Sequence, residues 1–170
     1  APRLALKHRL TDTINLRASS GIYYQYLHRI PRFIATDIWV ASNQDQDRSR
    51  AIHAIVGYQQ ELKNNFQFEV EAYWKGYSQI FAFNQTFLTE LEETSHDEDG
   101  DPIFTNARGL FNDGDGHSVG LEVMLRKDSR ALTGWAAYSL ARTEYRFDSV
   151  NSDRDFTPRH DRTHVVNLVA

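Results

Sequence analysis

The sequence contains no cysteine, a single methionine and only four prolines among its 170 residues. The absence of cysteine excludes a disulfide framework and every metal site built on thiolates. Charge of one sign is not in excess either, since 19 Lys and Arg stand against 23 Asp and Glu. A basic surface of the kind that binds nucleic acid is therefore not expected, and no nucleic-acid partner is predicted.

Long hydrophobic runs are also missing. The sequence has no stretch of about 18 consecutive apolar residues, which excludes a membrane-spanning helix. It does not exclude membrane-crossing strands, because these alternate lipid-facing and lumen-facing residues and look hydrophilic on average. No cysteine nucleophile, G-x-S-x-G element or phosphate-binding glycine loop occurs, so the chain is not expected to be an enzyme.

Period-two alternation is the dominant pattern that the sequence does contain. In FQFEVEAYWKGYSQ, residues 66–79, apolar side chains alternate with charged or polar ones. Such alternation predicts a strand with one apolar and one wet face. At about fourteen residues this strand is much longer than the usual five or six of globular proteins.

Seven stretches of this kind predict a meander of antiparallel strands. The expected strands cover residues 3–10, 14–27, 51–62, 66–79, 117–128, 131–147 and 162–170. Short turns alternate along the chain with three long connections, at about 29–48, 80–116 and 148–160. The facing of the last two strands is left open, because both of their faces are apolar.

Two all-β architectures fit this pattern. A soluble sandwich or jelly roll also alternates apolar and polar residues. Short turns on one rim and long loops on the other are typical of outer-membrane β-barrels. Aromatic residues near the long loops suggest an interfacial girdle, namely Tyr23, Tyr24, Tyr26, Tyr73, Trp74, Tyr77, Tyr138 and Tyr145. Strand length, loop asymmetry and these aromatic ends favour the transmembrane barrel, with short periplasmic turns and long extracellular loops.

Several loose motifs occur in a specific order in the second half of the chain. They are Gly114 and Gly116, then Gly120, Leu121 and Glu122, then Gly134, Tyr138 and Ala141, and finally Asp161 and His164. In order and spacing they resemble the C-terminal part of the barrel in TonB-dependent receptors of bacterial outer membranes. Residues 2–26 also resemble a hairpin common in these barrels.

The resemblance implies a barrel of 22 strands with an N-terminal plug domain inside, energised by the TonB complex. Such receptors lie in the lipid of the outer membrane and import scarce ligands: ferric siderophores, haem, cobalamin, nickel chelates or oligosaccharides. We expect residues 1–170 to be part of such a barrel, without the plug domain and the closing strands. Two alternatives remain: a soluble extracellular carbohydrate-binding module and a passive porin-like channel.

Charged residues on the predicted wet faces are the candidate ligand-path residues. They are Arg17, Glu69, Glu71, Lys75, Glu122 and Arg126. The alternative is that these side chains only solvate the inner wall or pair with a plug domain.

The acidic segment HDEDGD, residues 96–101, is the preferred candidate for a metal site, since His160 and His164 lie at the start of an expected strand and are too far apart to share a zinc ion. Asp97, Asp99 and Asp101 have the alternate spacing of calcium-binding loops. The complete loop pattern would need a glutamate where Arg108 stands. A solvated acidic loop is therefore the preferred interpretation and a Ca²⁺ site the alternative, and no other cofactor is expected.

Overall fold

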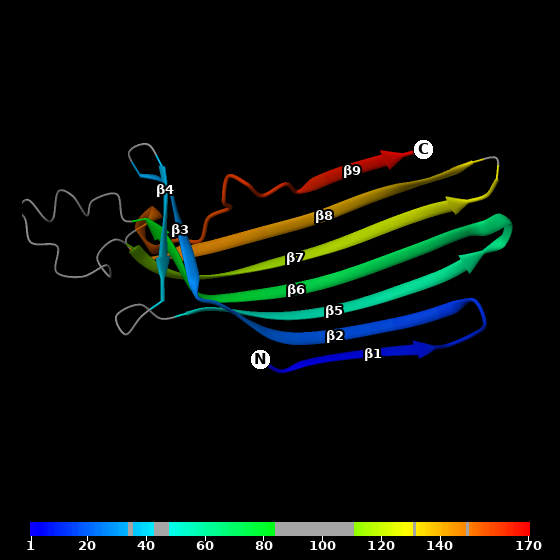
Figure 1. Ribbon diagram of the computed structural model, residues 1–170, viewed down its shortest axis with the longest axis horizontal. Helices are drawn as coiled ribbons and strands as arrows, with labels where there is room; N and C mark the ends of the chain where they lie inside the picture. The colour runs from blue at the N-terminus through cyan, green and yellow to red at the C-terminus, as the bar shows by residue number, and fades with distance from the viewer. Residues whose placement is uncertain (34–35, 43–47, 84–110, 131, 149) are drawn as a thin grey trace, which may run out of the picture.

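A computed structural model describes residues 1–33, 36–42, 48–83, 111–130, 132–148 and 150–170. This part of the chain is all-β, with one antiparallel sheet of seven strands, a separate two-stranded sheet and almost no helix. The strand order is β1-β2-β5-β6-β7-β8-β9, an up-and-down meander (Figure 1). The strands are β1 (Arg3–Arg9), β2 (Ile14–Gln25), β5 (Ser49–Leu62), β6 (Phe66–Phe83), β7 (Phe111–Asp128), β8 (Thr133–Phe147) and β9 (His164–Val169).

All seven predicted strands are confirmed, but three of them are longer than expected, β5 by two residues at its start and β6 and β7 by more. The predicted connection 80–116 is wrong at both ends, since β6 continues to Phe83 and β7 begins at Phe111. β6 passes a bulge between Tyr77 and Ile80 before it pairs again. The acidic, glycine-containing run 112–116 is typical of a turn. Here it is strand because Gly114 and Gly116 pair with both neighbouring strands.

The prediction of an irregular connection at 29–48 is also wrong. It contains most of a hairpin of β3 (Leu27–Phe33) and β4 (Thr36–Ala41). Proline removes a backbone donor and is a signal against a regular strand, which is why the sequence did not indicate β3. The pairing accommodates Pro31 by a register irregularity between Ile30 and Phe33. The hairpin runs across the end of the seven-stranded sheet (Figure 1).

Short connections lie together at one end of the sheet, opposite that hairpin (Figure 1). We call this the short-turn end and the opposite one the long-loop end. The β5–β6 turn is η1 (Lys63–Asn65), in which Asn64 and Asn65 have φ values of 61° and 59°. Asparagine tolerates this left-handed conformation. The β8–β9 connection contains the short turn η3 (Asn151–Asp153) at the long-loop end.

The strand register assigns each side chain to one of two faces. One row, on what we call the apolar face, consists of His8, Leu16, Tyr58, Val70, Val123, Tyr138 and Val166. The adjacent row, on the charged face, consists of Arg9, Asn15, Gln59, Glu69, Met124, Ala137 and Asn167. The register thus also settles the facing of β8 and β9, which the sequence left open.

A second layer does not cover the apolar face within the described part of the chain. Phe111 and Phe147 are the only large apolar residues buried there, whereas Leu6 is 61% exposed, Val56 59% and Leu168 75%. Soluble monomers rarely expose an apolar surface that extends over a whole sheet. None of the described segments is a helix with the length and hydrophobicity of a membrane span.

Candidate functional site on the charged face

The six predicted ligand-path residues share one face of the sheet. Their positions in the register put all of them on the charged face: Arg17 on β2, Glu69, Glu71 and Lys75 on β6, and Glu122 and Arg126 on β7. The alternation in the sequence predicted this correctly. The register between the strands adds which of these six side chains lie close to one another.

Arg17 and Glu69 form an ion pair across an intervening strand. The Arg17 Nη2 atom lies 2.9 Å from Glu69 Oε2, with β5 between the two strands. Gly57 occupies the position of β5 opposite Arg17, so no side chain blocks the guanidinium. The Gln67 Nε2 group donates to the other Glu69 oxygen at 2.7 Å. Both oxygens of this half-buried carboxylate are thereby engaged.

A hollow of about 340 Å³ lies beside this ion pair. Its charged-face lining consists of Ala5, Lys7, Arg17, Ser19, Ile55, Gly57 and Glu71. The Arg17 Nε atom is buried and has no hydrogen-bond partner among the described residues. The hollow therefore combines cationic groups from β1 and β2 with a carboxylate from β6. It can bind a polar group through hydrogen bonds and charge, but presents no nucleophile paired with a base.

Two carboxylates lie directly opposite each other on β6 and β7. Glu71 pairs in register with Glu122 on the charged face. Like charges in this position repel and destabilise a sheet. Neither glutamate forms an ion pair with another described residue. The pair is therefore suited to a cationic group supplied from outside the described residues.

A row of tyrosines lies nearer the long-loop end of the same face. Tyr23, Tyr77 and Tyr145 occupy one register row, separated by Ala51 and Gly116. The rings of Tyr77 and Tyr145 meet edge to face with centroids 6.1 Å apart. A Cβ on Gly116 would collide with the ring of Tyr145, so the glycine provides the space in which this ring lies.

Basic groups flank the tyrosine row. The Arg3 guanidinium carbon lies 4.5 Å from the Tyr23 ring centroid, and the His53 ring centroid lies 4.4 Å from it. The Lys75 amine lies 4.4 Å from the ring centroid of Tyr73. Together these groups form an aromatic and cationic surface that could stack on a planar ligand or hold an anionic one.

The predicted aromatic girdle is wrong for half of its members. Tyr23, Tyr73, Tyr77 and Tyr145 lie on the charged face, whereas Tyr24, Trp74 and Tyr138 lie on the apolar face. The alternation in the sequence already places Tyr23 and Tyr73 on the wet face, and the girdle prediction did not take this into account. The tyrosine row itself could not be found from the sequence, because it depends on register between strands.

The predicted acidic site lies outside the described residues. Asp97, Asp99 and Asp101 fall within 84–110, which the structure does not describe. Within the described ranges, no group of three or more His, Asp or Glu side chains is arranged to hold a metal ion.

Comparison with known proteins does not assign a family. A scan of protein-family models, a search of curated proteins and a search of solved structures found no match to this chain.

Proposed function

We propose that this chain is a segment of the wall of an outer-membrane β-barrel. The observation that carries the proposal is the single sheet of long strands whose apolar face is uncovered in the described part of the chain. On β6 the apolar face runs without a charge from Phe66 to Trp74, about nine residues. A tilted transmembrane strand needs about 9–11 residues to cross the hydrocarbon.

Polar groups bound this apolar band at both ends, as a bilayer requires. At the short-turn end Gln60 and Lys127 lie on the apolar face. At the long-loop end the same face carries His117 and Glu144, which lie 3.4 Å apart. These polar groups would lie at the two membrane surfaces, where water and lipid headgroups solvate them.

The charged face would then line a wet lumen. Its ion pair, hollow and tyrosine row suit a path for a polar ligand that is too large for simple diffusion. Together with the resemblance to TonB-dependent receptors, this supports uptake of a siderophore, cobalamin, haem or oligosaccharide in a full-length receptor with its own plug domain. The edge strands β1 and β9 each have one unpaired side, which neighbouring barrel strands would fill.

Site-directed spin labelling tests the membrane placement. Because the chain has no cysteine, single substitutions Phe68→Cys, Glu69→Cys, Val70→Cys and Glu71→Cys can each carry one nitroxide. In lipid vesicles we expect labels at 68 and 70 to be relaxed by oxygen, which concentrates in lipid. Labels at 69 and 71 should be relaxed by a water-soluble nickel chelate. Equal access of the chelate to all four positions would contradict the proposal.

Uptake measurements test the ligand path. In cells that express the full receptor, Glu69→Gln with Glu71→Gln should reduce uptake of one of the radiolabelled probes: a ferric siderophore, haem, cobalamin or an oligosaccharide. The matched control is Glu61→Gln, since Glu61 is exposed at the short-turn end of β5. Uptake that persists after the proton gradient is dissipated would instead indicate a passive channel.

A further inference from the structure

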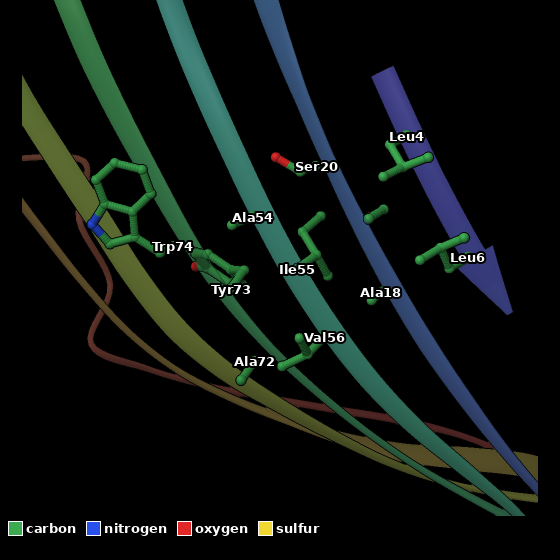
Figure 2. Close-up of a pocket in the computed structure, with 11 residues that line it drawn as sticks. Leu4, Leu6, Ala18, Ser20, Ala54, Ile55, Val56, Ala72, Tyr73 and Trp74 are labelled. Carbon is green, nitrogen blue, oxygen red and sulfur yellow. The ribbon is translucent and has the colours of Figure 1, made fainter. Parts of the chain in front are cut away.

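A groove lies on the apolar face between β1 and β6 (Figure 2). Its volume is about 480 Å³, within the range of roughly 300–1,000 Å³ that is usual for ligand pockets. Leu4 and Leu6 of β1 lie on one side and Trp74 of β6 on the other, as Figure 2 shows. The side chains between them on this face are Ala18, Ser20, Ala54, Val56 and Ala72, all smaller than leucine. The groove is therefore a mostly apolar trough across neighbouring strands.

Two arginines lie on the same side of the sheet, nearer the long-loop end. Arg50 is exposed and pairs in register with Tyr24, on the apolar face. The Arg48 guanidinium carbon lies 4.6 Å from the Tyr24 ring centroid. Neither arginine forms an ion pair with another described residue. Among the described residues, no carboxylate therefore competes with an anion for these guanidinium groups.

The distance between the groove and the arginines matches the dimensions of a lipid. Arg50 precedes Ala54 of the groove by four residues on β5, or about 13 Å at 3.3 Å per residue. Along β5 the apolar face runs from Ala54 through Ile52 to Arg50, and the Tyr24 ring lies beside Arg50 in the same register row. An acyl chain that leads to a phosphate has the same order of chemistry.

We propose that this surface binds one phosphate-bearing lipid, with an acyl chain in the groove and the phosphate at Arg48 and Arg50. Guanidinium groups bind phosphate oxygens through charge-assisted hydrogen bonds. The inference rests on the proposed membrane placement and adds a specific lipid site to it.

Trp74 provides a local probe for this site. In a variant with Trp39→Phe and Trp135→Phe, Trp74 is the only tryptophan left. The protein is reconstituted in phosphatidylcholine vesicles that contain a small, equal fraction of brominated phosphatidylglycerol or brominated phosphatidylcholine. Bromine quenches indole fluorescence at short range. We expect quenching by the brominated phosphatidylglycerol to be at least twofold stronger at equal mole fraction.

Substitutions at the two parts of the site should abolish this preference. Arg48→Gln with Arg50→Gln should reduce quenching by phosphatidylglycerol to the level of phosphatidylcholine. Ala54→Phe should do the same by filling the groove, although it makes the face more apolar. The matched control is Arg130→Gln, at the short-turn end, which should keep the preference. Glycerol phosphate without acyl chains should not displace the lipid.

The outcomes separate the inference from the proposed function. Equal quenching by both lipids, or a preference that survives loss of both arginines, would overturn the lipid site and leave the membrane placement intact. Displacement by glycerol phosphate would indicate a plain phosphate site and also overturn it. Absence of quenching by either lipid would contradict the membrane placement itself. In that case, self-association of the chain would indicate that a second copy covers the apolar face.

Discussion

Val70 and Glu71 are neighbours on β6 that face opposite environments. Val70 lies in the apolar row that crosses all seven strands, and Glu71 lies on the charged face opposite Glu122. If the apolar face contacts lipid, Val70→Arg places a charge near the middle of the hydrocarbon. We expect it to lower the free energy of unfolding by about 2–4 kcal/mol, measured by denaturant unfolding in lipid vesicles.

The matched substitution at Glu71 should not lower the free energy of unfolding. Glu71→Arg replaces a like-charge pair with Glu122 by a favourable one, worth about 0.2–1 kcal/mol. We therefore expect a neutral to slightly stabilising effect in the same unfolding experiment. Equal destabilisation by both arginine substitutions would show that the two faces are not in different environments.

Gly57 and Gly114 both lie on the charged face but differ in the space around them. A Cβ on Gly57 would lie 3.7 Å from the nearest atoms of Arg17 and Glu71, an ordinary contact. A Cβ on Gly114 would collide with the Phe147 ring and the carbonyl oxygen of Arg146. We expect Gly57→Ala to be neutral or to stabilise by up to about 1 kcal/mol. Gly114→Ala should destabilise by about 1–3 kcal/mol.

Thermal or denaturant unfolding of both alanine variants measures this difference. Because the two substitutions are chemically identical, intrinsic strand propensity cancels between them. Similar effects at both positions would mean that close packing against Phe147 does not determine the requirement for glycine.

At the scale of elements, the β3–β4 hairpin is attached to the sheet through a buried histidine. His28 is 6% exposed, and its ring centroid lies 4.7 Å from that of Phe81 on β6. Its Nε2 atom is 3.1 Å from Ser42 Oγ, just after β4. Burial lowers the pKa of His28 below its ordinary value of 6.5, because desolvation disfavours the charged imidazole.

The lowered pKa predicts that acid weakens this attachment. The detached hairpin binds the proton more readily than the attached one, so attachment is fully favoured above pH 6.5. It is lost as the pH falls through 6.5 toward the lower pKa of the attached state. We expect amide hydrogen exchange in β3 and β4, corrected for its intrinsic pH dependence, to be faster at pH 5 than at pH 7.5. His28→Gln should remove this difference, and equal protection of the wild-type hairpin at both values would contradict it.

Local patterns account for the elements that the sequence could predict. Alternation within 66–79 assigns the faces of Val70 and Glu71 from neighbouring residues alone. The β3–β4 hairpin was not predicted because Pro31 interrupts the alternation of apolar and polar residues. The strand pairing accommodates this proline by a register irregularity, which the sequence does not show. The Arg17–Glu69 ion pair joins residues 52 apart across β5. It depends on the register between β2, β5 and β6, which a single sequence does not reveal.

At the scale of the whole molecule, the absence of a covering layer over the described sheet is the central feature. A soluble sandwich would bury the row of Leu16, Val70 and Val123 beneath a second sheet. In the described part of the chain, that row has no such cover. We propose that lipid covers this row in the folded state, because polar groups bound the apolar band at both ends.

Circular dichroism combined with sedimentation, in plain buffer and in detergent micelles, tests this claim most directly. The lipid-facing account predicts that the chain aggregates or is unfolded in buffer and acquires β-structure in micelles. A monomeric β-protein that unfolds cooperatively in plain buffer would contradict it, because an uncovered apolar face of this extent would not remain monomeric in water.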